Sequence, residues 1–431
     1  MTRANWMTGL VTAGMIGGLT LGLTLGLTGG LAQAQSPQGA AFHYDGRMEV
    51  RPQSGEIAVD WQITAHEDDL DSVTFMLSPA VGVPVIDGAD VVSVEASSLD
   101  GFSGPIALYT VALAPAGDTP RRIHVAYAGE LLPEPLQHEI NTVDPHKVEL
   151  TVDSFWMPFD QRFSSLVTAE IDIAIEGEWA GVATQEIMPV EGGFHLVQSR
   201  PSLDISFTLM ADYRLTEADG YRIYDLRPGS EADLTALVGA LDHCTGYLNT
   251  LAASAGPLPQ AQITVTRRDA GGYSRGTLIA LTDIAGSDPE NLIQFICHEL
   301  SHYWSYGNAM TVENWLNESF ADYTAILGMR DRYGEEVFQA RLQRYRDQIG
   351  EDVLPAIWTP GTTERPPYLV AYRKGPLALA RLEAHVGRDR FADFIQACMM
   401  AQVRTTPDML AQLESVAGAE ARHWFEAVLA E

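Results

Sequence analysis

The sequence predicts an α+β protein of more than one domain, in which a β-sandwich-like N-terminal domain precedes a mostly helical domain. Short segments of alternating apolar and polar residues run from Phe42 to about Asp225, and helical periodicity dominates after that point. With 431 residues, 46% of them hydrophobic, the chain can fold into two or three packed domains. We place a signal peptide at 1–34, the β-rich domain at 35–226 and the mostly helical domain at 227–431.

The first 34 residues have the features of an export signal. Arg3 is their only charged residue, an apolar stretch runs from about Trp6 to Gly30, and Ala32-Gln33-Ala34 supplies small residues for cleavage. We expect export to a periplasm or beyond. A membrane span needs about 20 apolar residues, so an uncleaved segment that anchors the protein in a membrane is the alternative.

The β-rich domain is predicted from period-two segments separated by clusters of Pro, Gly and Asp. We expect it to be a scaffold or a wall of the substrate site, without chemistry of its own. The expected strands are Glu56–Thr64, Val73–Leu77, Val91–Ala96, Ile106–Ala112, Arg122–Ala128, Val148–Val152, Leu166–Ile175 and Ile205–Ala211.

The second domain begins with a helix expected from about Ser230. Strands at Ile263–Arg267 and Gly276–Thr282 then predict a small sheet. From Asp288 onward the pattern is helical, except for a proline-containing loop at Glu351–Pro367.

Charge and cysteine content exclude two classes of protein. Lys and Arg number 27 against 57 Asp and Glu, for a formal net charge of −30. Such a surface repels a phosphate backbone, so we expect no nucleic-acid partner. Cys244, Cys297 and Cys398 are an odd number at wide spacing, so at most one disulfide forms and no disulfide framework holds the fold.

The strongest chemical signal is His298-Glu299-Leu300-Ser301-His302, inside a helical pattern from Asn291 to Trp304. Histidines at i and i+4 lie one turn apart on one helix face, so both imidazoles can bind a single zinc ion. Glu299 could then take a proton from a zinc-bound water and pass it to the leaving amine. The alternative is an amphipathic helix with two ordinary histidines.

A second expected helix carries Trp315-Leu316-Asn317-Glu318-Ser319-Phe320-Ala321-Asp322-Tyr323. Glu318 would complete a His-His-Glu site for one zinc ion and leave a fourth position open for water, as in catalytic zinc sites. Asp322, one turn further on, either fixes the orientation of a ligand histidine or is an exposed helical carboxylate. Both interpretations stay open from the sequence.

These motifs together resemble the aminopeptidase N-like gluzincin metallopeptidases. That family has an HExxH helix, a W-L-N-E-G-F-A segment and a Tyr-Glu-Lys-Gly motif, and here the counterparts read HELSH, WLNESFADY and YRKG. The resemblance implies a thermolysin-like catalytic domain, with His298, His302 and Glu318 as zinc ligands and Glu299 as the general base. It also implies that Tyr372 donates to the oxyanion, whereas a tyrosine in this position is otherwise a packing or capping residue.

The chain departs from the family pattern in three places. Residues 303–317 form a shortened connection between His302 and Glu318, and only short helices follow Gly387, which implies a more open cleft. The family's G-A-M-E-N strand, whose glutamate binds the substrate α-ammonium, is replaced by Gly271-Gly272-Tyr273-Ser274-Arg275. These residues are the expected substrate-binding strand, with Ser274 in place of the glutamate.

Arg275 in this strand allows two interpretations. Its guanidinium either faces the cleft, where it would bind a carboxylate and repel an α-ammonium, or points outward from an edge strand into solvent. We favour the outward orientation.

The resulting hypothesis is an exported zinc metallopeptidase with a peptide or protein substrate and atypical recognition of the substrate N-terminus. Whether it cleaves at chain ends or internally stays open. One alternative is a periplasmic peptide-binding or assembly protein on the same fold, and another is a zinc hydrolase of a non-peptide substrate.

Overall fold

The computed structural model describes residues 40–67, 70–101, 104–115, 117, 119–131, 141–227, 234–267, 272–284 and 286–431. The predicted signal peptide, the predicted helix start at Ser230 and Gly271 lie outside these residues. The chain divides into two compact units, and the division between them falls after Arg214. The described part of the second unit comprises Leu215–Arg267 and Gly272–Glu431. Within the described ranges, no helix is both long enough and apolar enough to cross a membrane.

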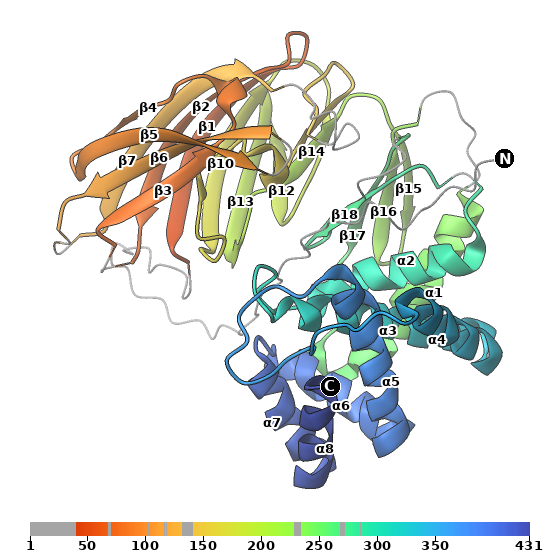
Figure 1. The fold of residues 1–431 in the computed structure, drawn as a ribbon. Coiled ribbons are helices and arrows are strands. Elements are labelled where there is room, and N and C mark those ends of the chain that lie inside the picture. The colour runs from red at the N-terminus through yellow and green to blue at the C-terminus, as the bar shows by residue number, and fades with distance from the viewer. Residues whose placement is uncertain are drawn as a thin grey trace, which may run out of the picture. The chain divides into compact units, whose positions relative to one another are not determined.

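The first unit is built almost entirely of strands (Figure 1). A seven-stranded sheet has the order β12-β13-β10-β1-β2-β7-β4, a four-stranded sheet has the order β5-β6-β3-β9, and a three-stranded sheet has the order β11-β14-β8. β1 pairs with β2 in antiparallel and with β10 in parallel register. The elements are β1 Phe42–Arg51, β2 Glu56–Ala65, β3 Ser72–Leu77, a 3-10 turn Pro79–Val81, β4 Val85–Asp87, β5 Val91–Gly101, β6 Gly104–Leu113, β7 Arg121–Glu130, β8 Lys147–Leu150, a 3-10 turn Val152–Ser154, β9 Phe159–Asp160, β10 Val167–Ile175, β11 Ala180–Ala183, β12 Glu186–Val190, β13 Gly193–Ser202 and β14 Phe207–Met210.

One core joins the sheets of the first unit, as the predicted sandwich requires. Trp61 from the seven-stranded sheet, Phe75 from the four-stranded sheet and Phe207 from the three-stranded sheet are buried in the same cluster. Trp156 lies against Trp61 with ring centroids 5.8 Å apart, and its carbonyl oxygen accepts a hydrogen bond of 2.6 Å from the Tyr127 hydroxyl. The long strands β1, β2, β7 and β10 bury alternate residues, as the period-two interpretation requires.

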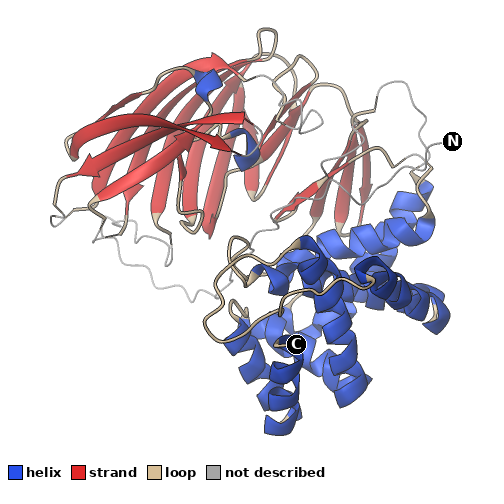
Figure 2. Ribbon diagram, viewed as in Figure 1, coloured by secondary structure: helices blue, strands red, loops and turns tan. Residues whose placement is uncertain are grey.

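The second unit has a five-stranded sheet, ordered β15-β16-β17-β19-β18, and helices (Figure 2). β16, β17 and β19 run parallel, whereas β18 closes an antiparallel hairpin with β19. The helices α1 and α2 lie along this sheet (Figure 1) and share one core with it. The elements are β15 Arg214–Ala218, β16 Tyr221–Asp225, α1 Thr235–Ala252, a 3-10 turn Ala253–Ala255, β17 Ala261–Val265, β18 Tyr273–Arg275, β19 Leu278–Leu281, α2 Pro289–Ser301, a 3-10 turn His302–Trp304, α3 Asn314–Tyr333, α4 Glu335–Ile349, a π-helical turn Val370–Lys374, α5 Gly375–Val386, α6 Arg388–Ala401, α7 Thr406–Ala417 and α8 Ala419–Leu429.

The sheet of the second unit shifts the domain boundary. β16 pairs in parallel with β17, so Tyr221–Asp225 belongs to the sheet of the second unit rather than to the β-rich domain predicted for 35–226. The sequence could not reveal this, because β16 has the same alternating pattern as the strands before it. Only the partner strand decides to which sheet a strand belongs.

A single disulfide joins Cys244 of α1 to Cys297 of α2, while the third cysteine, Cys398, is free and buried. The bridge lies close to α3, because a Cβ atom added at Gly328 would come within 3.0 Å of the Cys297 sulfur. Three helices therefore meet at the disulfide, immediately before His298 in the chain.

Candidate active site

Helix α2 carries the first four residues of the motif, including His298 and Glu299. Asp288 caps its N-terminus by accepting a hydrogen bond from the Asn291 amide, and Pro289 occupies the first helical position. The α-helix ends at Ser301, so His302 begins a 3-10 turn instead of continuing the helix as predicted. His298 and His302 still meet, and their Nε2 atoms are 3.1 Å apart.

Helix α3 brings Glu318 to the two histidines. Its Oε2 atom lies 3.5 Å from His298 Nε2 and 3.6 Å from His302 Nε2. The side-chain amide of Asn317 hydrogen-bonds both the N–H and the carbonyl of Gly307, each at 2.9 Å. Asn317 thereby ties the shortened connection to the start of α3, so the shortening does not displace Glu318.

The three donor atoms fit a zinc ion. A tetrahedral ion with ligands at about 2.0–2.1 Å requires donor atoms about 3.3 Å apart, close to the separations above. Glu318 is fully buried, and neither of its carboxylate oxygens has a hydrogen-bond partner. A buried carboxylate with free oxygens beside two imidazoles is suited to bind a metal cation. Among the described residues, these three are the only group of His, Cys, Asp or Glu side chains that could hold a metal.

Glu299 follows His298 on α2 and is buried beside this cluster. Both of its carboxylate oxygens are buried without a hydrogen-bond partner. Burial raises the pKa of Glu299 to about 7, although the positive charges of His298 and Arg275 act in the opposite direction. A carboxyl group with a pKa near neutrality can both accept and release a proton.

Asp322 stands behind His298 and is not the exposed carboxylate that the sequence also allowed. Its Oδ1 atom is 3.7 Å from His298 Nδ1 and accepts a 3.0 Å hydrogen bond from Gln294. Its Oδ2 atom accepts a 2.6 Å hydrogen bond from the Tyr345 hydroxyl. Burial alone would lower the pKa of His298, but Asp322 and Glu318 raise it to about 10. For His302, the effect of burial outweighs the opposing effect of the Glu318 charge and lowers the pKa to about 4.

Tyr372 lies on the π-helical turn Val370–Lys374, which packs against α3, the helix that carries Glu318. Its ring stacks on that of His298 with centroids 6.0 Å apart, and its hydroxyl is buried without a hydrogen-bond partner. Burial and the neighbouring Glu318 raise the pKa of Tyr372 well above its usual value. The hydroxyl therefore stays protonated and able to donate at neutral pH.

The strand that was expected to bind substrate is β18, at the edge of its sheet. Tyr273, Ser274 and Arg275 are all buried, and the Ser274 hydroxyl donates to the backbone carbonyl of Glu299 at 3.4 Å. Arg275 is only 3% exposed, with its guanidinium 5.3 Å from the Tyr273 ring centroid, so the solvent-facing orientation is wrong. Gly272 precedes the strand, and a Cβ atom there would meet the Ala280 carbonyl at 3.2 Å.

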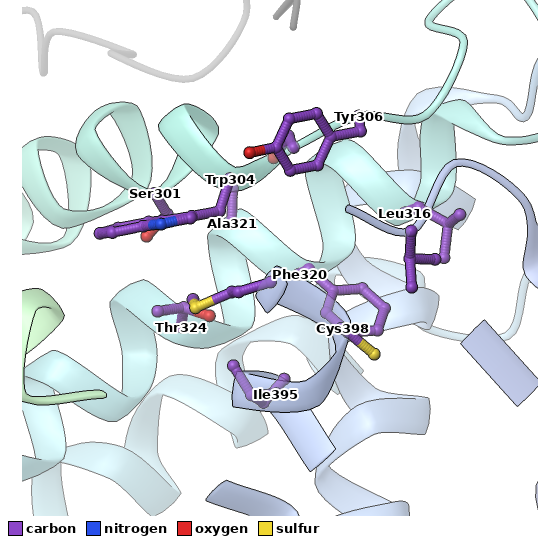
Figure 3. Close-up of a pocket in the computed structure, with 12 residues that line it drawn as sticks. Ser301, Trp304, Tyr306, Leu316, Phe320, Ala321, Thr324, Ile395 and Cys398 are labelled. Atoms are coloured by element: carbon purple, nitrogen blue, oxygen red, sulfur yellow. The ribbon is translucent and has the colours of Figure 1, made fainter. Parts of the chain in front are cut away.

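A small cavity lies between the 3-10 turn after α2, α3 and α6 (Figure 3). Its volume is about 40 Å³, and its walls include Trp304, Phe320 and Cys398. None of the candidate ligands, nor Glu299 or Tyr372, lines it. A space of this size holds water rather than a peptide side chain, so we assign it to packing and not to substrate binding.

The sequence did not indicate several residues that hold the site together. Gln294 lies one turn before His298 on α2, so its spacing could have revealed it. Tyr345 is far away in the sequence and gives no local signal. Arg373 follows Tyr372 directly, but nothing in the sequence distinguishes a buried arginine from an exposed one.

Residues 274–424 match the family model described as the peptidase family M1 domain. This segment is a peptidase M1 domain. The match confirms the resemblance to the aminopeptidase N-like gluzincins, which are zinc metallopeptidases, and the requirement for one zinc ion. No curated protein matches the chain.

Solved structures confirm the two-part fold that contains the M1 domain. The chain is similar to an M1 zinc metallopeptidase from Deinococcus radiodurans, with a TM-score of 0.60, 15% identity, and coverage of 91% of this chain and 94% of that one. A variant of that enzyme bound to a Tyr-Ser-Ala substrate has a TM-score of 0.60 and 16% identity to this chain, with the same coverage. Native yeast LTA4 hydrolase has a TM-score of 0.64 and 17% identity, and the match covers 90% of this chain and 66% of that one.

Proposed function

We propose that the protein is an exported zinc metallopeptidase with atypical recognition of the substrate N-terminus. The observation that carries the proposal is the triangle of His298, His302 and Glu318, with the partnerless carboxylate of Glu299 beside it. A protein that only binds peptides has no use for Glu299, whose burial without a partner is unfavourable. The M1 domain match supports the same reaction class.

The residues of the site divide the reaction between them. Zinc held by His298, His302 and Glu318 would polarise the scissile carbonyl and acidify the attacking water. Glu299 accepts a proton from that water on a carboxylate oxygen and delivers it to the nitrogen of the leaving amine. The Tyr372 hydroxyl donates a hydrogen bond to the carbonyl oxygen as negative charge develops there. The edge strand β18 offers backbone groups to an extended substrate.

Arg275 is the reason to expect unusual substrate recognition. It places a buried positive charge close enough to Glu299 to lower the pKa of that carboxyl group. A substrate α-ammonium in the same region would be repelled, and Ser274 offers no carboxylate to offset that repulsion. We therefore favour substrates whose N-terminus is not a free ammonium at this strand, including internal peptide bonds.

Two features support export. The N-terminal 34 residues have the pattern of a signal peptide, and the Cys244–Cys297 disulfide is typical of oxidising compartments. If the N-terminal segment is retained, it would hold the enzyme at a membrane.

The test is a peptide-library digest in which every peptide is present with a free and with an acetylated N-terminus, and products are read by mass spectrometry. Glu299→Gln should lower the rate by about 10² to 10⁴-fold while zinc content stays the same. Glu336→Gln, an exposed glutamate on α4, is the control and should leave the rate unchanged.

The cleavage pattern decides the specificity. Internal cleavage of both peptide forms indicates an endopeptidase, and cleavage of free N-termini alone indicates an aminopeptidase in which another group binds the ammonium. If zinc is bound and neither form is cleaved, the proposal fails in favour of a binding protein or a hydrolase of non-peptide substrates. A Glu299→Gln enzyme as active as the wild type would also overturn it.

A further inference from the structure

Arg373, on the π-helical turn, has a buried guanidinium surrounded by named partners. Its charge lies over two aromatic rings, with centroid distances of 4.4 Å to Tyr345 and 5.2 Å to Tyr368. One terminal nitrogen donates to the Tyr368 hydroxyl at 2.8 Å and the other to the Tyr372 carbonyl at 2.6 Å, while Nε donates to Gln348. Arg373 is only 3% exposed, so these contacts lie in the protein interior and not at the surface.

On one side, the Arg373 guanidinium faces the carboxylate of Asp322, which lies behind the candidate metal ligand His298. Arg373 Nη1 is 3.8 Å from Asp322 Oδ2, the atom that also accepts from Tyr345. The other oxygen of Asp322 faces His298 Nδ1. The positive charge and the aromatic contact with Tyr345 therefore hold the carboxylate that orients a candidate zinc ligand.

On the other side, the same guanidinium holds the residues around Tyr372. Tyr368, bound by Arg373 through its hydroxyl, stacks on the Tyr372 ring at 4.7 Å. Tyr372 in turn stacks on His298. Arg373 thus fixes Tyr372 twice, through its backbone carbonyl and through the ring that packs against it.

The turn and α3 are also joined directly. The Ser319 hydroxyl, next to Glu318 in the chain, donates to the Ala371 carbonyl at 2.6 Å. A Cβ atom at Gly375 would come within 1.9 Å of that hydroxyl oxygen, so only glycine permits the approach. This contact sets the distance across which Arg373 reaches Asp322.

We propose that Arg373 is a positioning residue that couples the metal site to the Tyr372 hydroxyl, by holding Asp322 behind His298 and the Tyr368–Tyr372 stack at the same time. The proposed effect of Arg373 on Tyr372, the Tyr372 half of the inference, rests on the proposed peptidase function. Its proposed effect on Asp322, the Asp322 half, requires only that the site binds zinc. Lysine would retain the charge toward Asp322 but could not supply the planar fork that binds two oxygens and stacks on rings.

The experiment measures zinc affinity by chelator competition, kcat and KM with a cleaved peptide, and the melting temperature. Arg373→Gln should weaken zinc binding by about 10 to 100-fold and lower kcat with little change in KM. Arg373→Lys should recover much of the zinc affinity but not kcat. Arg344→Gln, at an exposed position of α4, is the control and should match the wild type.

A second variant covers the case in which Arg373→Gln does not fold. Tyr368 is 40% exposed, so Tyr368→Leu should fold, keep the wild-type zinc affinity and lower kcat. Wild-type zinc affinity and kcat in Arg373→Gln, or parallel losses of both in Arg373→Lys and Tyr368→Leu, would overturn the inference. An inactive wild type that binds zinc tightly would instead overturn the proposed function, and the zinc affinity of Arg373→Gln would then decide the Asp322 half.

Discussion

Glu299 and Glu318 are buried carboxylates whose oxygens have no hydrogen-bond partner. Desolvating an ionised carboxylate without a partner is expensive, and such groups are otherwise rare in protein interiors. Each of them matches a role that needs an unoccupied oxygen, one as a metal ligand and one as a base. Their lack of hydrogen-bond partners is therefore a property of the site.

Replacing Tyr372 separates the oxyanion role from packing. Tyr372→Phe keeps the ring that stacks on His298 and removes only the hydroxyl. We expect kcat to fall by about 10² to 10³-fold, with KM and zinc content close to wild type because the hydroxyl is not a metal ligand. Steady-state kinetics and metal analysis check this, and an unchanged kcat would show that the hydroxyl does not take part in the reaction.

The sequence indicated individual site residues where a local pattern encodes them. The i, i+4 spacing of His298 and His302 needs only a helix, so it could be recognised without tertiary information. The environments of Asp322 and Arg275 depend on which distant residues pack against them. The neighbouring sequence does not encode that packing. The two open interpretations of Asp322 and the wrong orientation of Arg275 have this common cause.

Helices α1 and α2 depend on their covalent link, which closes a sequence separation of 53 residues. Loop-closure entropy for this length corresponds to about 4 kcal/mol of stabilisation. The double variant Cys244→Ala/Cys297→Ala should lose about that amount in urea denaturation followed by circular dichroism. Cys398→Ala, which removes a buried but unbridged thiol, should lose far less, and equal losses in the two proteins would contradict the expected role of the bridge.

Among the elements, the sequence located many strands, including the four-residue strands β8, β14 and β19, but missed β1 and β13, although both are ten residues long. β2 and β7 lie within a residue or two of their predicted bounds. β18 lies within the strand expected at residues 271–275, whereas the π-helical turn, which packs against α3, was not expected. Elements that require a partner to form cannot be read from their own residues.

The molecule contains two units with separate cores, and the metal ligands all lie in the second one. Zinc should therefore stabilise the second unit alone. At a free zinc concentration 100 times Kd, the gain is about 2.7 kcal/mol, which corresponds to a shift of about 5–10 °C for a unit of this size. Calorimetry with and without a chelator should show one transition that moves and one that does not. Equal shifts of both would mean that the units unfold together.

The position of the disulfide has a consequence for how the enzyme matures. In a reduced chain, Cys297 is a soft thiol adjacent to His298, and Cys244 lies opposite it on α1. Thiolates compete strongly for zinc, so a metal ion that arrived before oxidation would meet sulfur ligands beside the intended nitrogen and oxygen ones. Oxidation removes both competitors and leaves His298, His302 and Glu318 as the cluster that binds the metal. Disulfide formation before metal loading is thus the order that yields a correctly assembled site.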